Sequence, residues 1–178
     1  RLMTSYEYEI VKKKLHKPSL GTQKITQYGY PTNFLTYARG GHGLFSSLED
    51  YNKFAQMLLT GKTKIGSTIL SKSMLKMATT NHLKSSFFPL EIKNFDVKII
   101  EENDLEPYGR GLGFRVMMDL KKSDNMSNIG EFGWAGAAAT YFLVDPTNDL
   151  TAVLMTQVLG ADNTLKKEFV KIIYQYLK

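Results

Sequence analysis

The segment GEFGWAGAAATYFLVDPTNDLTAVLMTQ, residues 130–157, constrains the fold most, because it contains two β-type runs separated by a turn sequence. Aromatic and β-branched residues predict strands over 130–144 and 149–158, and the Asp-Pro-Thr-Asn-Asp sequence between them is typical of a tight reversal. A third strand is expected over residues 108–120, whose glycines indicate close packing or a bulge. The three strands together predict an antiparallel meander.

Helical patterns flank this meander. Ser47 followed by Asp50 is similar to a capping box, and the apolar residues after it recur at helical spacing, which predicts a helix over 48–59 that ends at Gly61. A second helix is expected over 72–79, with Ser71 as its N-cap. The last sixteen residues, NTLKKEFVKIIYQYLK, place their apolar residues on one helical stripe. Helices, a meander and a closing helix predict an α+β layered fold.

Composition narrows the possible functions. A length of 178 residues is enough for one domain with a core, and no apolar run is long enough for a membrane helix. The absence of cysteine excludes disulfides and thiolate chemistry. The three histidines, His16, His42 and His82, lie far apart in the chain, so we expect no metal and no cofactor.

The net charge of +6 permits an anionic partner. Because no basic motif with interleaved aromatic residues accompanies the lysines, we expect a solvated basic surface rather than a nucleic-acid-binding domain. The chain begins with the charged and polar RLMTSYEYEI, in which no signal peptide is visible. The compartment therefore stays open between cytoplasmic and exported.

Trp134, the single tryptophan, stands between glycines and is followed by three alanines. Small residues at the start of a strand allow another group to approach the backbone closely. The residues alone leave two explanations, a binding wall or a core strand whose alanines accommodate a packed helix.

A resemblance to a known family is carried by four blocks in order: GGHGLFSSLEDYNKFAQMLLTG, ILSKSMLKMATTNHL, YGRGLGF and the 130–157 segment. They resemble the C-terminal part of the serine β-lactamase-like family, which includes class C β-lactamases, DD-peptidases and related esterases. The resemblance, over about residues 1–158, implies a β-lactamase/transpeptidase-like α+β fold with an antiparallel sheet flanked by helices. It implies that residues 1–178 form one C-terminal fragment, with 1–107 lining the site and 108–178 forming the meander and the last helix.

The resemblance also implies site residues. Trp134, Ala135 and Gly136 stand where the family has its K-T-G strand motif, and they would bind substrate. The backbone N–H of Ala137 would complete the oxyanion hole, and His42 would line the substrate pocket. Because an indole cannot supply the positive charge of the motif's lysine, esters or amides without a carboxylate are favoured over β-lactams, while β-lactams and D-amino-acid peptides stay among the candidates.

The family's other motifs, S-x-x-K and a Tyr-x-Asn or Ser-x-Asn loop, have no convincing counterpart. Ser73 with Lys76, and the run Ser123-Asp124-Asn125, match by spelling, but they occur in the wrong sequence context. We therefore expect that the nucleophile lies outside these residues. The parent protein would be a serine hydrolase acting on a small-molecule or peptidoglycan-like ester or amide, and this chain alone would be inactive.

A fragment of this kind would have further partners. It would pair with the missing N-terminal portion of its own protein, and without that portion it would self-associate through an exposed sheet edge. The alternative function is a non-catalytic peptide- or cell-wall-binding module of the same fold.

Overall fold

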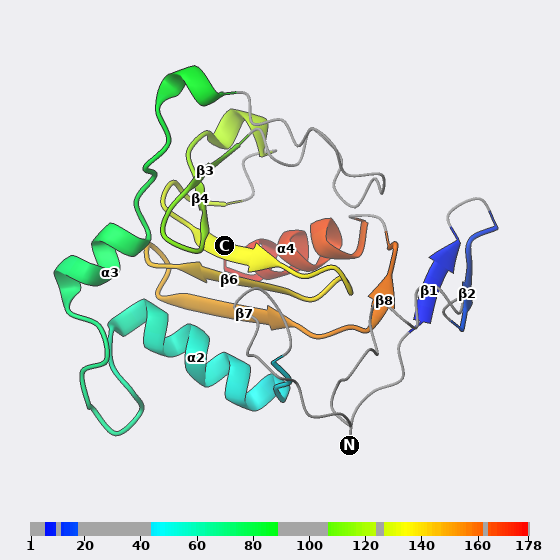
Figure 1. Ribbon diagram of the computed structural model, residues 1–178, viewed down its shortest axis with the longest axis horizontal. Coiled ribbons are helices and arrows are strands. Elements are labelled where there is room, and N and C mark those ends of the chain that lie inside the picture. The colour runs from blue at the N-terminus through cyan, green and yellow to red at the C-terminus, as the bar shows by residue number, and fades with distance from the viewer. Residues whose placement is uncertain are drawn as a thin grey trace, which may run out of the picture.

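The computed structural model describes residues 6–9, 12–17, 44–88, 107–123, 127–161 and 164–177 (Figure 1). Its main sheet is antiparallel, with five strands in the order β3-β4-β5-β6-β7. These strands are β3 (Tyr108–Arg110), β4 (Arg115–Met117), β5 (Phe132–Ala135), β6 (Tyr141–Asp145) and β7 (Leu150–Leu154). The expected α+β architecture, an antiparallel sheet flanked by helices, is confirmed.

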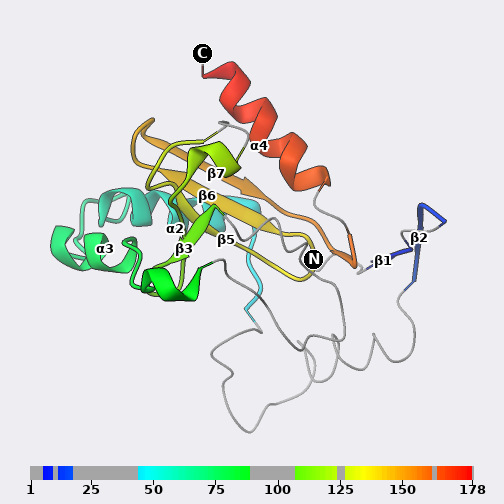
Figure 2. The same ribbon diagram turned by 90° about the horizontal axis from the view of Figure 1, so that it is seen from above.

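The two faces of the sheet carry different helices. The alternation of side chains along β6 sends Phe142 and Val144 to the core that contains Ala55 and Leu58 of α2 (Leu48–Thr60). Leu143, in the same strand, packs in a second cluster with residues of α4 (Thr164–Tyr176). Figure 2 shows α4 lying along one side of the sheet. The sheet is therefore the middle of three layers.

A smaller sheet pairs the first two strands with a short strand that follows β7. Its order is β2-β1-β8, with β1 (Tyr6–Glu9), β2 (Lys14–His16) and β8 (Val158–Leu159). β1 runs antiparallel to β2 and parallel to β8, with Tyr6 opposite Val158 (Figure 1). The first strand is thus held beside the segment that follows β7.

The meander has more strands than the sequence analysis predicted. The single strand expected over 108–120 is a hairpin, because Gly113 adopts a φ of +92° and turns the chain between β3 and β4. Close packing there is confirmed, since a Cβ on Gly111 would lie 2.1 Å from the carbonyl oxygen of Ala78. The strand expected over 130–144 is likewise divided into β5 and β6 by a turn.

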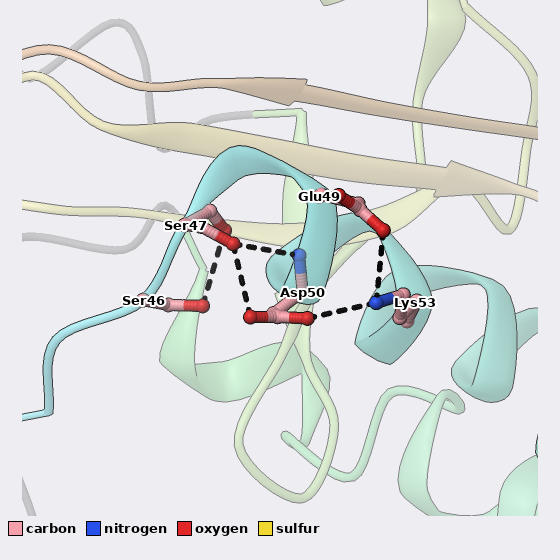
Figure 3. A network of polar contacts seen from close by, with 5 residues as sticks. All are labelled: Ser46, Ser47, Glu49, Asp50 and Lys53. Atoms are coloured by element: carbon pink, nitrogen blue, oxygen red, sulfur yellow. Dashed lines mark hydrogen bonds and ion pairs between the residues drawn. The ribbon is translucent and has the colours of Figure 1, made fainter.

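The helices before the meander form where their caps predicted. The hydroxyl of Ser47 accepts a hydrogen bond from the Asp50 N–H at 3.1 Å (Figure 3). Gly61, with a φ of +74°, ends α2. Lys53 lies 2.9 Å from the Asp50 carboxylate, which extends the network along the first turn. The second helix, α3 (Lys72–Ala78), has its expected N-cap at Ser71.

Short 3₁₀ turns complete the described structure, at η1 (Ser85–Phe87) and η3 (Leu120–Lys122). Among the residues that the structure describes, no helix combines the length and the apolar character that crossing a bilayer requires.

Replacement of the α2 cap should destabilise the fold. We expect Ser47→Ala to lower the free energy of unfolding by about 1 kcal/mol, because the Asp50 N–H loses its acceptor at the helix start. Urea unfolding followed by circular dichroism measures this loss. Ser46→Ala is the matched control, since the exposed Ser46 hydroxyl donates to the Ser47 carbonyl, which keeps the Tyr51 N–H as a partner, and it should leave stability unchanged. Equal effects of the two substitutions would contradict the capping role.

The outer edge of β7 should promote self-association. Within the described residues β7 pairs only with β6, so its other edge presents unpaired backbone groups. We expect the sedimentation coefficient of the 178-residue chain to rise with concentration in velocity ultracentrifugation. A single monomeric species over the whole concentration series would refute this expectation.

Candidate functional site

The hairpin between β5 and β6 ends in a five-residue turn, Gly136 to Thr140. Ala135 pairs with Tyr141, the Gly136 N–H donates to the Thr140 carbonyl at 2.8 Å, and the Ala139 N–H donates to the Gly136 carbonyl at 3.0 Å. Ala139 has a φ of +58°, a left-handed conformation that alanine rarely adopts. The alanines that suggested a strand are thus the tip of a hairpin.

This turn is fixed from outside as well as from within. The carbonyl oxygen of Ala138 accepts the Val158 N–H at 3.1 Å and also the hydroxyl of Thr156, both from the segment after β7. Gly136 leaves room for the Thr140 hydroxyl, which would lie 2.2 Å from a Cβ at that position and would have to rotate away. Four hydrogen bonds among the described residues thus hold the turn in the conformation seen.

Ala137 lies at the exposed apex of this turn. Its neighbours donate or accept hydrogen bonds, but its own N–H has no acceptor in the described parts of the chain. Ala135 and Gly136, which precede it, are also exposed. Within the described residues the turn thus presents a backbone donor without an acceptor, at the residue where the family resemblance implies an oxyanion contact.

Trp134 precedes this donor by three residues, and it is 45% exposed although it lies within a strand. The guanidinium carbon of Arg110 lies 5.2 Å from the centroid of its ring system, a distance typical of a cation–π contact. Sequence reasoning missed Arg110. The signal was available only through the β3–β4 hairpin, whose register sets Arg110 opposite Arg115 and Arg115 opposite Gly133.

A buried charge cluster lies behind the turn. The Arg115 guanidinium lies between the rings of Tyr108 and Tyr141, at 4.3 and 4.5 Å, and it contacts the Glu131 carboxylate at 3.1 Å and the Tyr141 hydroxyl. Burial raises the pKa of the Glu131 carboxyl, and the charge of Arg115 opposes that rise. Among the described residues the Arg115 Nε has no partner.

Tyr174 connects this cluster to α4. Its hydroxyl donates to the Asp145 carboxylate at 2.8 Å, and burial raises the pKa of this phenol. The same carboxylate oxygen accepts from the side-chain amides of Asn128 at 2.7 Å and Asn148 at 2.9 Å. Asp145, which is fully buried, therefore joins β6, the turn after it and the last helix.

The remaining sequence candidates do not form a catalytic pair in the described residues. His42 lies outside the described residues, as do Asp124 and Asn125. The Ser73 hydroxyl lies 3.0 Å from that of Ser71, and no hydrogen bond links it to Lys76 within the described helix. The Ser123 hydroxyl donates to a backbone carbonyl at 3.0 Å. In the described part of the chain, no group of three or more His, Cys, Asp or Glu residues could hold a metal ion.

Comparison with known proteins shows the family to which this chain is similar. A family model described as Beta-lactamase matches residues 9–175. Two curated proteins of Mycobacterium tuberculosis, Protein Rv1367c (strain H37Rv) and Uncharacterized protein MT1414 (strain CDC 1551), are each 28% identical over 132 residues, which is 68% of this chain and 29% of theirs.

Two solved structures show the same fold. EstCE1, described as a hydrolase with promiscuous acyltransferase activity, gives a TM-score of 0.66 at 16% identity, over 96% of this chain and 43% of that one. A LovD6 mutant of Simvastatin Synthase (LovD) from Aspergillus terreus gives a TM-score of 0.68 at 17% identity, over 98% of this chain and 43% of that one. The chain thus spans less than half the length of these four proteins.

Removal of the Tyr174 hydroxyl should destabilise the attachment of α4. We expect Tyr174→Phe to lower the free energy of unfolding by about 2 kcal/mol, because a buried carboxylate loses a charge-assisted hydrogen bond. Tyr176→Phe is the matched control in the same helix, since Tyr176 is 88% exposed and should tolerate the change. Urea titration of both variants compares them, and a loss in Tyr174→Phe no larger than in the control would contradict the role of Tyr174.

Proposed function

This chain belongs to the Beta-lactamase family, and we propose on that basis that it forms one wall of the active site of a serine hydrolase that acts by acyl transfer on an ester or amide. Its described residues would supply the oxyanion donor and the surface against which the acyl group lies. The catalytic serine and its base would come from residues outside this chain.

The observation that carries this proposal is the free N–H of Ala137. In acyl transfer the carbonyl oxygen gains negative charge as the nucleophile attacks, and a fixed donor aimed at that oxygen lowers the barrier. Removal of one such donor typically costs about 3–4 kcal/mol in the transition state. An exposed donor on a hydrogen-bonded turn suits this task, because among the described residues no hydrogen bond of its own has to break before it acts.

The residues before Ala137 suit a substrate wall. Trp134, Ala135 and Gly136 are exposed along the end of β5, and two of them have little or no side chain, so an acyl group could lie close to the backbone. The indole would cover one side of that group. From the resemblance, His42 would line the pocket opposite.

Two observations support a nucleophile and a base outside this chain: the length of the related proteins and the positions of the serine motifs. The chain covers 29% of its curated relatives and 43% of the two solved structures, so most of each of those proteins has no counterpart here. Ser73 is an exposed helix residue that hydrogen-bonds to the cap of its own helix. An acyl-transfer enzyme needs a nucleophile and a base within hydrogen-bond reach of each other.

The proposed reaction has two steps, acylation of the serine and hydrolysis of the acyl-enzyme. The serine oxygen bonds to the substrate carbonyl carbon while its proton passes through a Lys/Tyr pair to the leaving alcohol or amine, and the carbon–leaving-group bond breaks. Water then attacks the acyl-enzyme and releases the acid and the serine. In both steps the Ala137 N–H would stabilise the oxyanion together with the nucleophile's own N–H. The names of the two solved neighbours, a hydrolase with acyltransferase activity and a synthase, support chemistry of this kind.

Intact-mass spectrometry after treatment with a fluorophosphonate, and separately with a penicillin, tests the proposal. We expect no adduct on the 178-residue chain, because the two candidate serines, Ser73 and Ser123, hydrogen-bond in the described residues to a hydroxyl and to a backbone carbonyl rather than to a base. We expect one fluorophosphonate adduct on a longer protein that contains this chain, at a serine outside residues 1–178. Ser73→Ala in that longer protein is the matched control and should leave the adduct unchanged.

Two other results would change the conclusion. A stoichiometric adduct at Ser73 would show that this serine is the nucleophile and would overturn the assignment of the site. A longer protein that gives no adduct, hydrolyses no nitrophenyl ester and still binds peptide or cell-wall fragments would establish the alternative, a non-catalytic binding module of the same fold.

A further inference from the structure

Arg110 is a half-buried cation without a carboxylate partner among the described residues, and it lies beside the exposed indole of Trp134. A guanidinium has five N–H donors. One of these reaches the Gly109 carbonyl at 3.3 Å, so most of the donor capacity of Arg110 is unused in the described residues. A partly desolvated charge with free donors favours an anionic partner.

The backbone of Arg110 is held in place on both sides. Its N–H donates to the Asn81 side-chain oxygen at 2.9 Å, and its carbonyl accepts the His82 N–H at 2.8 Å. Asn81 is itself fixed, because its amide donates to the Leu83 carbonyl at 3.1 Å. The Arg110 side chain therefore extends toward Trp134 from a backbone that hydrogen bonds hold in place.

The positive charge of Arg115, close to that of Arg110, makes an anion beside Arg110 more favourable. Arg115, opposite Arg110 in the hairpin, has its own carboxylate in Glu131, whereas Arg110 has none in the described chain. Burial, and then the charge of Arg115, lower the pKa of the Arg110 guanidinium from its ordinary value. Arginine nevertheless stays protonated in proteins, so the positive charge persists at neutral pH.

We propose that Arg110 and Trp134 form a subsite for a carboxylate carried by the acyl substrate. This inference rests on the proposed function, because the subsite matters for catalysis only if an acyl group lies along the Trp134–Ala137 segment. It revises the expectation that a substrate without a carboxylate is favoured. The strand motif offers an indole and no charge, but the neighbouring hairpin brings a guanidinium to that indole.

The distance between the two groups sets the length that the substrate needs. Trp134 and Ala137 are three residues apart, so their Cα atoms lie at most about 10 Å from each other. The Arg110 guanidinium lies 5.2 Å from the centre of the indole, so one substrate reaches both groups only if the chain between its carboxylate and its carbonyl spans the whole gap. Half-esters of dicarboxylic acids and acylated amino acids carry the two groups that such a substrate needs.

The single tryptophan of the chain gives a test that needs no catalysis. We would titrate the 178-residue chain with monomethyl glutarate, and with its neutral counterpart dimethyl glutarate, while following the emission of Trp134. We expect a saturable change with the monoester and roughly tenfold weaker binding of the diester, because charge-assisted hydrogen bonds are lost. N-acetyl-alanine and its amide, used in the same way, distinguish a peptide carboxylate from a dicarboxylate half-ester.

Substitutions identify the cation. Arg110→Gln should weaken monoester binding roughly tenfold and leave diester binding unchanged, and Arg110→Lys should restore part of the loss. Lys53→Gln is the matched control, since Lys53 is an exposed cation on α2 paired with Glu49 and Asp50, and it should change neither. If Arg110→Gln does not fold, two measurements still test the proposal: the binding of the monoester to Arg110→Lys, and the binding of monoester and diester to the unaltered chain. Equal binding of both esters, or discrimination that survives Arg110→Gln, would overturn the proposal.

Activity separates this proposal from the one on which it rests. In a longer protein that contains the chain, we expect kcat/KM to favour the nitrophenyl half-ester of glutarate over nitrophenyl butyrate, and Arg110→Gln to remove that preference. If neither ester is hydrolysed, the proposed function fails, whereas the fluorescence titration still confirms or refutes the carboxylate subsite.

Discussion

The buried contact between Arg115 and Glu131 is the interaction on which the rest of the described structure depends. Both side chains are almost fully buried, and such an ion pair needs further contacts to offset the loss of water. Among the described residues the Arg115 Nε is the buried side-chain donor that stays without a partner. Two tyrosine rings and the Tyr141 hydroxyl surround the guanidinium. A shift of β4 by one residue would place this charge in the apolar layer against α2, so the pair sets the register of the sheet.

The geometry of the candidate site follows from that register. Because Arg115 lies opposite Gly133, Trp134 falls just beyond the paired part of β4, where its indole stays accessible. Gly133 is needed at this point, since a Cβ there would lie 2.1 Å from the carbonyl oxygen of Phe142. The turn that follows is then fixed by the segment after β7. A buried charge cluster on one side of the sheet thus positions an exposed donor at its end.

Local signals in the sequence predicted the parts of this fold that local physics determines. α2 begins after Ser47 and ends at Gly61 as expected, because an N-cap and a left-handed glycine fix the two ends of a helix through contacts within that helix. The alanines after Trp134 resembled strand residues, and only the pairing of Ala135 with Tyr141 makes them a turn. The contact of Arg110 with Trp134 was invisible for the same reason, since it joins residues that only the folded sheet brings together.

The parallel pairing of β1 with β8 has a consequence for the order of folding. Tyr6 lies opposite Val158, so β1 can pair with β8 only after residue 158 has left the ribosome. Contacts between residues so distant in sequence form slowly, because the chain entropy of closing the loop has to be overcome first. The β5–β6 hairpin needs no such wait. During synthesis the turn that carries Ala137 can therefore form before β1 is added beside β8.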